Sequence, residues 1–570
     1  MAAGTQRTPF IRYAIAADLV MIAVAAAFFA PSSPAVPYLA LFTAVVLAAW
    51  LSGDEGGLAA TAVSVIVLAV FFPAHTDGGT LTAFAASGAA VSLFARAARH
   101  VQELDRAAAV PEPVAPERAD ALPVPVTAPA GALPFALGLP LLVVVLYADI
   151  SDTIMRHYPV PSLLRPLILL LGVVVWRYHK VFRPLSAALR APMVFFVLYA
   201  VVVFSTSVWA SNAYEADARF SEVTKAVMIC LVAASMAATW QALHRAFVAL
   251  VVTAAAMATV SVIQITTGHF QNILGGMVKV KEGTIYAEVS MPRASGPPVN
   301  DPNFYARILL FAIPLAIALA LNEQRPLRRL LYAGAAAVVT AATLLTYSRG
   351  AMLALAATAL MMVATVGLRR RHLAAIAVCS VALLFVLPDE VEQRLLTVKS
   401  IAGADRGGRL DSSVEKRRIL LGSGLGMFND HLLTGVGAGN FNTYYAKYAA
   451  RIGMSGIDYG IRGEHEFPHN LYLEIASETG LIGLASYGAI ALSILLALWN
   501  TRRLLRRRGD TPHAVLASCV AAAIAGYLVA SLFLHESHIR YFGLYVGFGI
   551  AVTRLAREQS ALPVMTEEAA

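Results

Sequence analysis

Two residues at the ends of long apolar stretches have side chains that could bind an anion or move a proton. His469 follows Pro468 at the start of such a stretch, and histidine, which titrates near neutrality, is the commonest general base. Arg293 lies shortly before a helix expected over 302–321. A helix N-terminus favours an anion, and the planar guanidinium suits phosphate oxygens. The competing interpretation is that both are structural residues at the membrane interface.

Four further cations lie in or next to expected helices. Lys225 is inside the stretch 221–240 and Arg307 is one turn into 302–321. A cation within a membrane span is costly and usually faces the bundle interior or a water-filled cavity. Arg219 lies just before the first of these stretches, and Arg349 lies in a tight turn between two others. Each is a candidate functional cation, although Arg349 equally fits a marker of the membrane boundary.

The remaining candidates are neutral or acidic. Asp301 precedes Pro302, a pattern typical of a helix cap and first turn. Glu474 and Glu478 lie one helical turn apart on one helical face. They fit two interpretations equally: partners of arginine or lysine in the bundle, or interfacial carboxylates near a helix start. Asn303 and Asn470 complete the supporting set, each in a motif with the residues above. The sequence lacks P-loop, GxSxG and DxD patterns, and the external pair His535 and His538 is a weak metal candidate, so we expect no metal and no cofactor.

The elements that position these residues are membrane helices. Hydrophobic residues make up 58% of the 570 residues and charged residues only 14%, with mean hydropathy +0.67, whereas soluble domains carry about 25% charged residues. A span needs roughly 20 mostly apolar residues. We therefore expect an all-α polytopic membrane protein with about sixteen spans: 11–30, 36–52, 57–73, 79–96, 134–150, 163–179, 190–210, 221–240, 245–266, 302–321, 329–347, 350–367, 372–388, 470–499, 512–533 and 540–556.

Basic residues concentrate in alternate loops, which the positive-inside rule assigns to the cytoplasm together with both termini. The net charge of +9 is then mostly a topology signal and gives little support to nucleic-acid binding. The three cysteines lie inside apolar runs, which argues against a disulfide framework and a zinc cluster. The expected organisation is a four-helix region (1–96), a Pro/Ala-rich cytoplasmic linker (97–131), a membrane domain (132–556) with a large external loop (389–469), and a cytoplasmic tail (557–570).

Four motifs in the last twelve expected spans, over about 134–556, resemble those of the O-antigen ligase and O-antigen polymerase family of bacterial inner-membrane proteins. The motifs are Arg293-Ala-Ser-Gly296 with Asp301-Pro-Asn303, Ser348-Arg-Gly-Ala351, Thr434-Gly-Val-Gly-Ala-Gly-Asn-Phe441, and His469-Asn-Leu-Tyr-Leu-Glu474 with Glu478-Thr-Gly-Leu-Ile-Gly483. Each is weak alone, but their order and the long loop before the last motif are specific. The chain departs from the family at Asp430–Gly435, where a proline often precedes the leucine-threonine pair.

The resemblance implies a metal-independent, inverting glycosyltransferase. Its donor would be a glycan on undecaprenyl diphosphate at the periplasmic face, and its acceptor a hydroxyl of lipid A–core, of a growing glycan or of a protein. His469 and Arg293 would be catalytic. Arg219, Lys225, Arg349 and Arg307 would bind the diphosphate, with membrane lipids as the only other partners.

Two other classes remain open at this stage. Many spans with intramembrane cations also suit a polysaccharide or lipid transporter or flippase. Against this, no internal repeat is visible, and the candidate residues lie on one face only. The second class is a structural or sensory membrane protein, which rests chiefly on the first four spans. Within the transferase interpretation itself, a protein O-oligosaccharyltransferase is a further alternative.

Overall fold

The computed structural model describes residues 133–151, 164–177, 187–267, 279–281, 292–297, 301–367, 412–452, 466–535 and 539–561. The chain divides into two compact units, Met1–Leu122 and Pro123–Ala570, and all described residues lie in the second. The expected spans before residue 97, the linker and the span at 372–388 lie outside the described residues. The domain boundaries therefore stay predictions.

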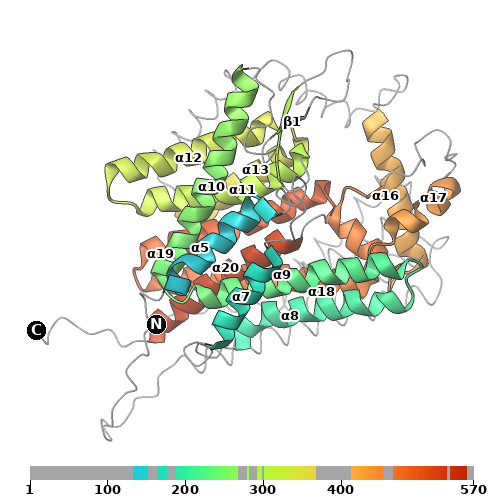
Figure 1. Ribbon diagram of the computed structural model, residues 1–570, viewed down its shortest axis with the longest axis horizontal. Coiled ribbons are helices and arrows are strands. Elements are labelled where there is room, and N and C mark those ends of the chain that lie inside the picture. The colour runs from blue at the N-terminus through green and yellow to red at the C-terminus, as the bar shows by residue number, and fades with distance from the viewer. Residues whose placement is uncertain are drawn as a thin grey trace, which may run out of the picture. The chain divides into compact units, whose positions relative to one another are not determined.

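The described part is helical apart from one pair of short strands (Figure 1). The longer helices are α5 (Leu133–Tyr147), α7 (Leu164–Arg177), α8 (Ala187–Ser205), α9 (Ala213–Met236), α10 (Trp240–Thr267), α11 (Pro302–Asn322), α12 (Pro326–Leu345), α13 (Arg349–Met362), α16 (Ser412–Asp430), α17 (Phe441–Arg451), α18 (Leu471–Arg507), α19 (Thr511–Ala530) and α20 (Ile539–Ala561). A π-helical turn, η5 (Val363–Gly367), extends α13, and two 3₁₀ turns, η3 (Thr206–Val208) and η6 (Ser531–Phe533), follow α8 and α19. Strands β1 (Lys279–Lys281) and β2 (Arg293–Ser295) pair antiparallel, with Lys281 opposite Arg293.

Seven helices in the described part are long and apolar enough to cross a membrane. They are α8, α10, α11, α12, α13, α18 and α19, while α5 and α7 are shorter apolar helices. The chain is therefore a polytopic, helical membrane protein. The larger number of about sixteen spans remains a prediction.

Helices α11 and α19 form the centre of the bundle and pack on each other. In α11, 89% of the membrane window is buried by protein, and in α19 78%, against 28–44% in the other five. A helix that is apolar all round is typically surrounded by others. Residues at the start of α11 are thus placed in the interior of the helix bundle.

Helix starts are fixed by local capping. Asp301 accepts hydrogen bonds from the backbone N–H groups of Asn303 and Phe304, and Ser348 accepts one from Ala351. Asn470 caps α18 by accepting from Leu473 N. These contacts satisfy N–H groups that a helix cannot pair internally, so the capping interpretation of Asp301 is confirmed.

Helix α18 is interrupted at Gly480, whose φ is 65°. A loop segment, residues 432–437, lies against Ser477–Ile482 and forms backbone hydrogen bonds with it. Val436 N donates to Ser477 O at 2.9 Å, and Leu481 N donates to Leu432 O at 2.8 Å. We call this paired region the α18 break. It draws part of the expected external loop into contact with a membrane helix.

Two glycines make the α18 break possible. Gly435 and Gly480 both have positive φ, and a Cβ on either would overlap the backbone of the opposite segment. We expect Gly435→Ala and Gly480→Ala to reduce sharply the yield of monodisperse protein after detergent extraction, measured by size-exclusion chromatography. Gly488→Ala, on the same helix and facing open space, is the matched control. A normal elution profile for Gly435→Ala would show that the break is not required for folding.

Candidate functional site

Arg293 joins three elements at the start of α11. From β2, its Nε donates to the backbone carbonyl of Thr346 at 2.8 Å, and its Nη2 donates to Asn303 Oδ1 at 3.4 Å. Thr346 is the C-cap of α12 and Asn303 is in the first turn of α11. The guanidinium therefore lies beside the N-terminus of α11, as predicted from the sequence.

Arg349 is the first residue of α13, on the turn that Arg293 contacts. Tyr347 in this turn has φ +50°, a left-handed conformation that is costly for a bulky residue and is often found at functional sites. Gly350 packs so closely on η6 that a Cβ would lie 2.6 Å from Phe533 Cβ. Arg293 thus bonds the turn that leads into Arg349, and that turn is fixed against the 3₁₀ turn after α19.

Arg307 is buried within the bundle and only 3% exposed. Its Nη1 makes long hydrogen bonds, both 3.4 Å, to Ser531 Oγ and to the carbonyl of His535. The guanidinium lies between the rings of Phe304 and Tyr527, 5.0 and 4.8 Å from their centroids.

No acidic side chain in the described part of the chain pairs with Arg307, and its Nε lacks a hydrogen-bond partner there. A buried cation without a counter-ion is unfavourable. The geometry therefore favours an anion as a ligand of this residue.

His469 lies in the turn before α18 and has φ +48°. Its ring meets that of His535 edge to face, with centroids 5.4 Å apart. The His535 ring also stacks on Phe467 at 4.3 Å and meets Phe304 of α11 at 4.9 Å. His469 is therefore linked through His535 to the same end of α11 that holds Arg293.

We call this site the α11 corner. It consists of β2, residues 301–307, the turn 346–350, the turn 466–470 and residues 531–535. It brings together four of the predicted residues with charged or titratable side chains: Arg293, Arg307, Arg349 and His469. Asp301, Asn303 and Asn470 support it as caps or hydrogen-bond partners.

His535 was expected only as part of a weak metal cluster with His538, which lies outside the described residues. Burial lowers the pKa of the His535 imidazole well below its usual range, and His469, Arg219 and Arg307 lower it further. His535 is thus uncharged at neutral pH. Within the described ranges, no three His, Cys, Asp or Glu side chains gather closely enough to hold a metal ion.

Arg219 and the two glutamates connect α9, α18 and the α18 break. Arg219 Nη2 donates to Glu474 Oε1 at 2.8 Å, and Glu474 is 1% exposed. Of the two interpretations of Glu474, pairing with arginine is the one confirmed here. Glu478 instead accepts hydrogen bonds from the backbone N–H groups of Gly439 and Phe441, at 2.8 and 3.2 Å. It holds the start of α17 against α18.

Lys225 also has an acidic neighbour, because its Nζ pairs with Glu222 one turn earlier on α9. None of the described contacts of Lys225 reaches the α11 corner. Arg219 and Lys225 therefore differ from Arg307, which has no carboxylate partner among the described residues.

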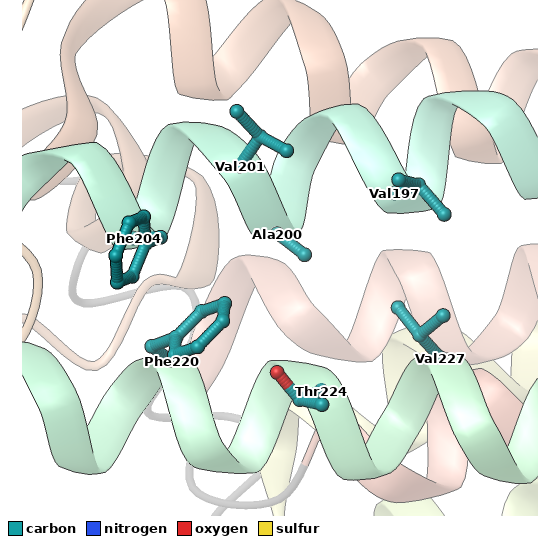
Figure 2. Close-up of a pocket in the computed structure, with 7 residues that line it drawn as sticks. All are labelled: Val197, Ala200, Val201, Phe204, Phe220, Thr224 and Val227. Atoms are coloured by element: carbon teal, nitrogen blue, oxygen red, sulfur yellow. The ribbon is translucent and has the colours of Figure 1, made fainter.

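An apolar groove of about 240 Å³ lies between α8 and α9 (Figure 2). Val197 and Val201 of α8 lie opposite Thr224 and Val227 of α9, and all lining atoms exposed in it are apolar. At one end the rings of Phe204 and Phe220 are 4.9 Å apart. Phe220 directly follows Arg219 in the sequence, and the Arg219 side chain pairs with Glu474.

Sequence reasoning missed a second buried ion pair. Arg540 Nη2 donates to Asp149 Oδ1 at 2.8 Å, with both side chains nearly fully buried. The pair ties the end of α5 to the start of α20, and Tyr147 donates nearby to the carbonyl of Ile308 in α11. The sequence signal for this pair was that Asp149 and Arg540 lie at the ends of the apolar runs 134–150 and 540–556.

Residues 334–488 match the family model described as O-antigen ligase. The chain carries an O-antigen ligase domain. This domain contains Arg349, His469, Glu474 and Glu478, while Arg293 and Arg307 precede it and His535 follows it. No curated protein matches the chain. The match implies a membrane enzyme of the glycosyltransferase type with lipid-linked glycan substrates.

Proposed function

We propose that this protein transfers a glycan from undecaprenyl diphosphate to a hydroxyl acceptor at the periplasmic face of the bacterial inner membrane. The observation that carries the proposal is the α11 corner. There Arg307, which is buried and has no acidic partner among the described residues, contacts His535 beside the candidate base His469, and Arg293 bonds the first turn of the same helix. A diphosphate needs several cations, and a transfer reaction needs a base within the same site. The O-antigen ligase domain supports this donor class.

In the donor complex, Arg293, Arg349 and Arg307 bind the diphosphate. The N-termini of α11 and α13 end in this corner, so their dipoles add to the positive potential. The arginines also stabilise the charge that develops on the leaving diphosphate. Arg219 and Lys225 stay predicted diphosphate ligands, but their ion pairs with Glu474 and Glu222 make them weaker candidates.

In the chemical step, the acceptor oxygen attacks the anomeric carbon as the bond from that carbon to the diphosphate oxygen breaks. The electron pair of the broken bond stays on the diphosphate. His469 takes the proton of the hydroxyl. Attack opposite the leaving group inverts the anomeric configuration, and the proposed mechanism uses no metal.

The apolar groove between α8 and α9 is suited to the polyprenyl chain of the donor. Val201 and Phe204 on its α8 wall are more than half exposed, and such surface is compatible with hydrocarbon. A chain in this groove would bring its diphosphate end towards Arg219 and the start of α18.

The test is reconstitution of the purified full-length chain in phospholipid vesicles. The donor is the lipid-linked glycan extracted from a strain that lacks the gene, and lipid A–core, more lipid-linked glycan and envelope protein are offered as separate acceptors. We expect one acceptor to gain the glycan while undecaprenyl diphosphate is released. Passage of the intact lipid-linked glycan across the vesicle membrane without any transfer would instead identify a transporter.

The orientation of the chain is part of the proposal: about sixteen spans with both termini in the cytoplasm. The segments assigned to the periplasm contact one another, as in the bond between Ser211 and Tyr444. Segments assigned to the cytoplasm do the same, as in the two bonds from Arg502 and Arg506 to the Thr365 carbonyl. Such grouping supports the alternation of loops.

A reporter fused at residue 430 is expected to be periplasmic, and one fused within 97–131 cytoplasmic. Alkaline phosphatase and green fluorescent protein fusions measure this directly, since each is active on one side only. Both reporters on the same side would overturn the span assignment.

A further inference from the structure

His535 has a ring nitrogen that takes no part in the proposed binding of the diphosphate or in the proposed base catalysis. Its Nδ1 is buried and has no hydrogen-bond partner in the described part of the chain. Buried polar atoms without partners are rare in folded proteins, and each calls for a ligand, a water or a functional explanation. The neighbouring ring is that of His469.

The surroundings of His535 hold the ring rigidly. It stacks on Phe467 with an interplanar angle of 3°, it meets Phe304 at 86°, and its backbone carbonyl accepts from Arg307. The charged and titratable groups that act on it are His469 from the turn before α18, Arg307 from α11 and Arg219 from α9. All three disfavour a proton on His535, so it remains a hydrogen-bond acceptor.

We propose that His535 is a positioning residue for His469, whose protonated ring it orients by accepting a hydrogen bond at Nδ1. This inference rests on the proposed function, in which His469 is the base. One nitrogen of His469 takes the proton from the acceptor hydroxyl, and the other donates its N–H to His535. No proton is transferred to His535. The arrangement follows the general pattern of a catalytic base held by a second group.

The test compares purified full-length variants with the lipid-linked glycan donor described above. His535→Phe keeps an aromatic ring for the stack on Phe467 and removes both nitrogens. We expect kcat to fall about 10- to 100-fold, the factor for a lost hydrogen bond to a charged group, with KM for the donor unchanged. His535→Asn, which places an amide oxygen near the position of Nδ1, should recover part of the loss.

Phe467→Leu is the matched control, because it removes the stacked ring and leaves the nitrogen of His535. If His535 acts only by packing, His535→Phe will have wild-type kcat and Phe467→Leu will be the impaired variant. That outcome overturns the inference, as does equal damage in His535→Phe and His535→Asn. Absence of transfer by the wild-type chain would instead refute the proposed function, so the two failures are distinguishable.

Discussion

Arg293→Ala is expected to lower glycan transfer by about 10²- to 10³-fold, the usual loss when one donor to a developing anion is removed. Arg293 lies in β2 beside the N-terminus of α11, and it bonds the carbonyl of Thr346, three residues before Arg349. Arg293→Lys should recover only part of the activity, because a point charge cannot reproduce a bidentate guanidinium. The measurement is the initial rate of transfer by purified protein in vesicles.

Because Arg293 also bonds Thr346 and Asn303, the amount of folded protein must be compared for each variant. Arg451→Ala is a suitable control, since Arg451 is a cation on α17 that pairs with Asp430 and is not part of the α11 corner. Its activity should be that of the wild type. Full activity in a well-folded Arg293→Ala variant would remove Arg293 from the site.

Replacement of His469 should lower the chemical step by about 10²- to 10⁴-fold, the contribution typical of a general base. Asparagine is the better substitution, because His469 has φ +48° and asparagine tolerates left-handed backbone more readily than alanine does. Donor binding should persist, since the arginines hold the diphosphate. Co-purification of lipid-linked glycan with His469→Asn, and less of it with Arg293→Ala, would separate the two roles.

His431→Gln is the control for this series, because His431 contacts Tyr444 at the end of α16 and lies outside the corner. If His469→Asn loses donor binding while the transfer of bound donor proceeds normally, the histidine is a diphosphate ligand. The base would then be sought on the same turn, where Glu466 and His465 precede it in sequence.

Much of the fold could be predicted because its signals are local. Apolar runs mark helices, and Asp301, Ser348 and Asn470 lie where caps are expected. The start of α9 could not be predicted well, since this helix begins at Ala213 rather than near 221. Its first turns carry acidic residues and Arg219, whose partner Glu474 is 255 positions away. In the sequence, a charged residue whose partner is far along the chain cannot be distinguished from a charged residue in a loop.

The same limitation applies to the candidate site. Motif resemblance selected Arg293, Arg349 and His469, and their meeting at the start of α11 depends on contacts between distant segments. His535 lacked a motif, and its importance rests on the ring contacts with Phe467 and His469. The break at Gly480 is similar, since a glycine within an apolar run does not reveal that residues 432–437 pair with it.

The α18 break also constrains how the protein can open. Backbone bonds from Val436, Gly437 and Leu481 cross between the loop and the helix, and Glu478 anchors Gly439 and Phe441. Loss of any one would leave buried amides without partners, so these bonds should break together. The start of α17 and the first turns of α18 therefore behave as one cooperative unit. His469 directly precedes the first turn of α18. The candidate base therefore belongs to a part of the chain that is expected to unfold as a whole or not at all.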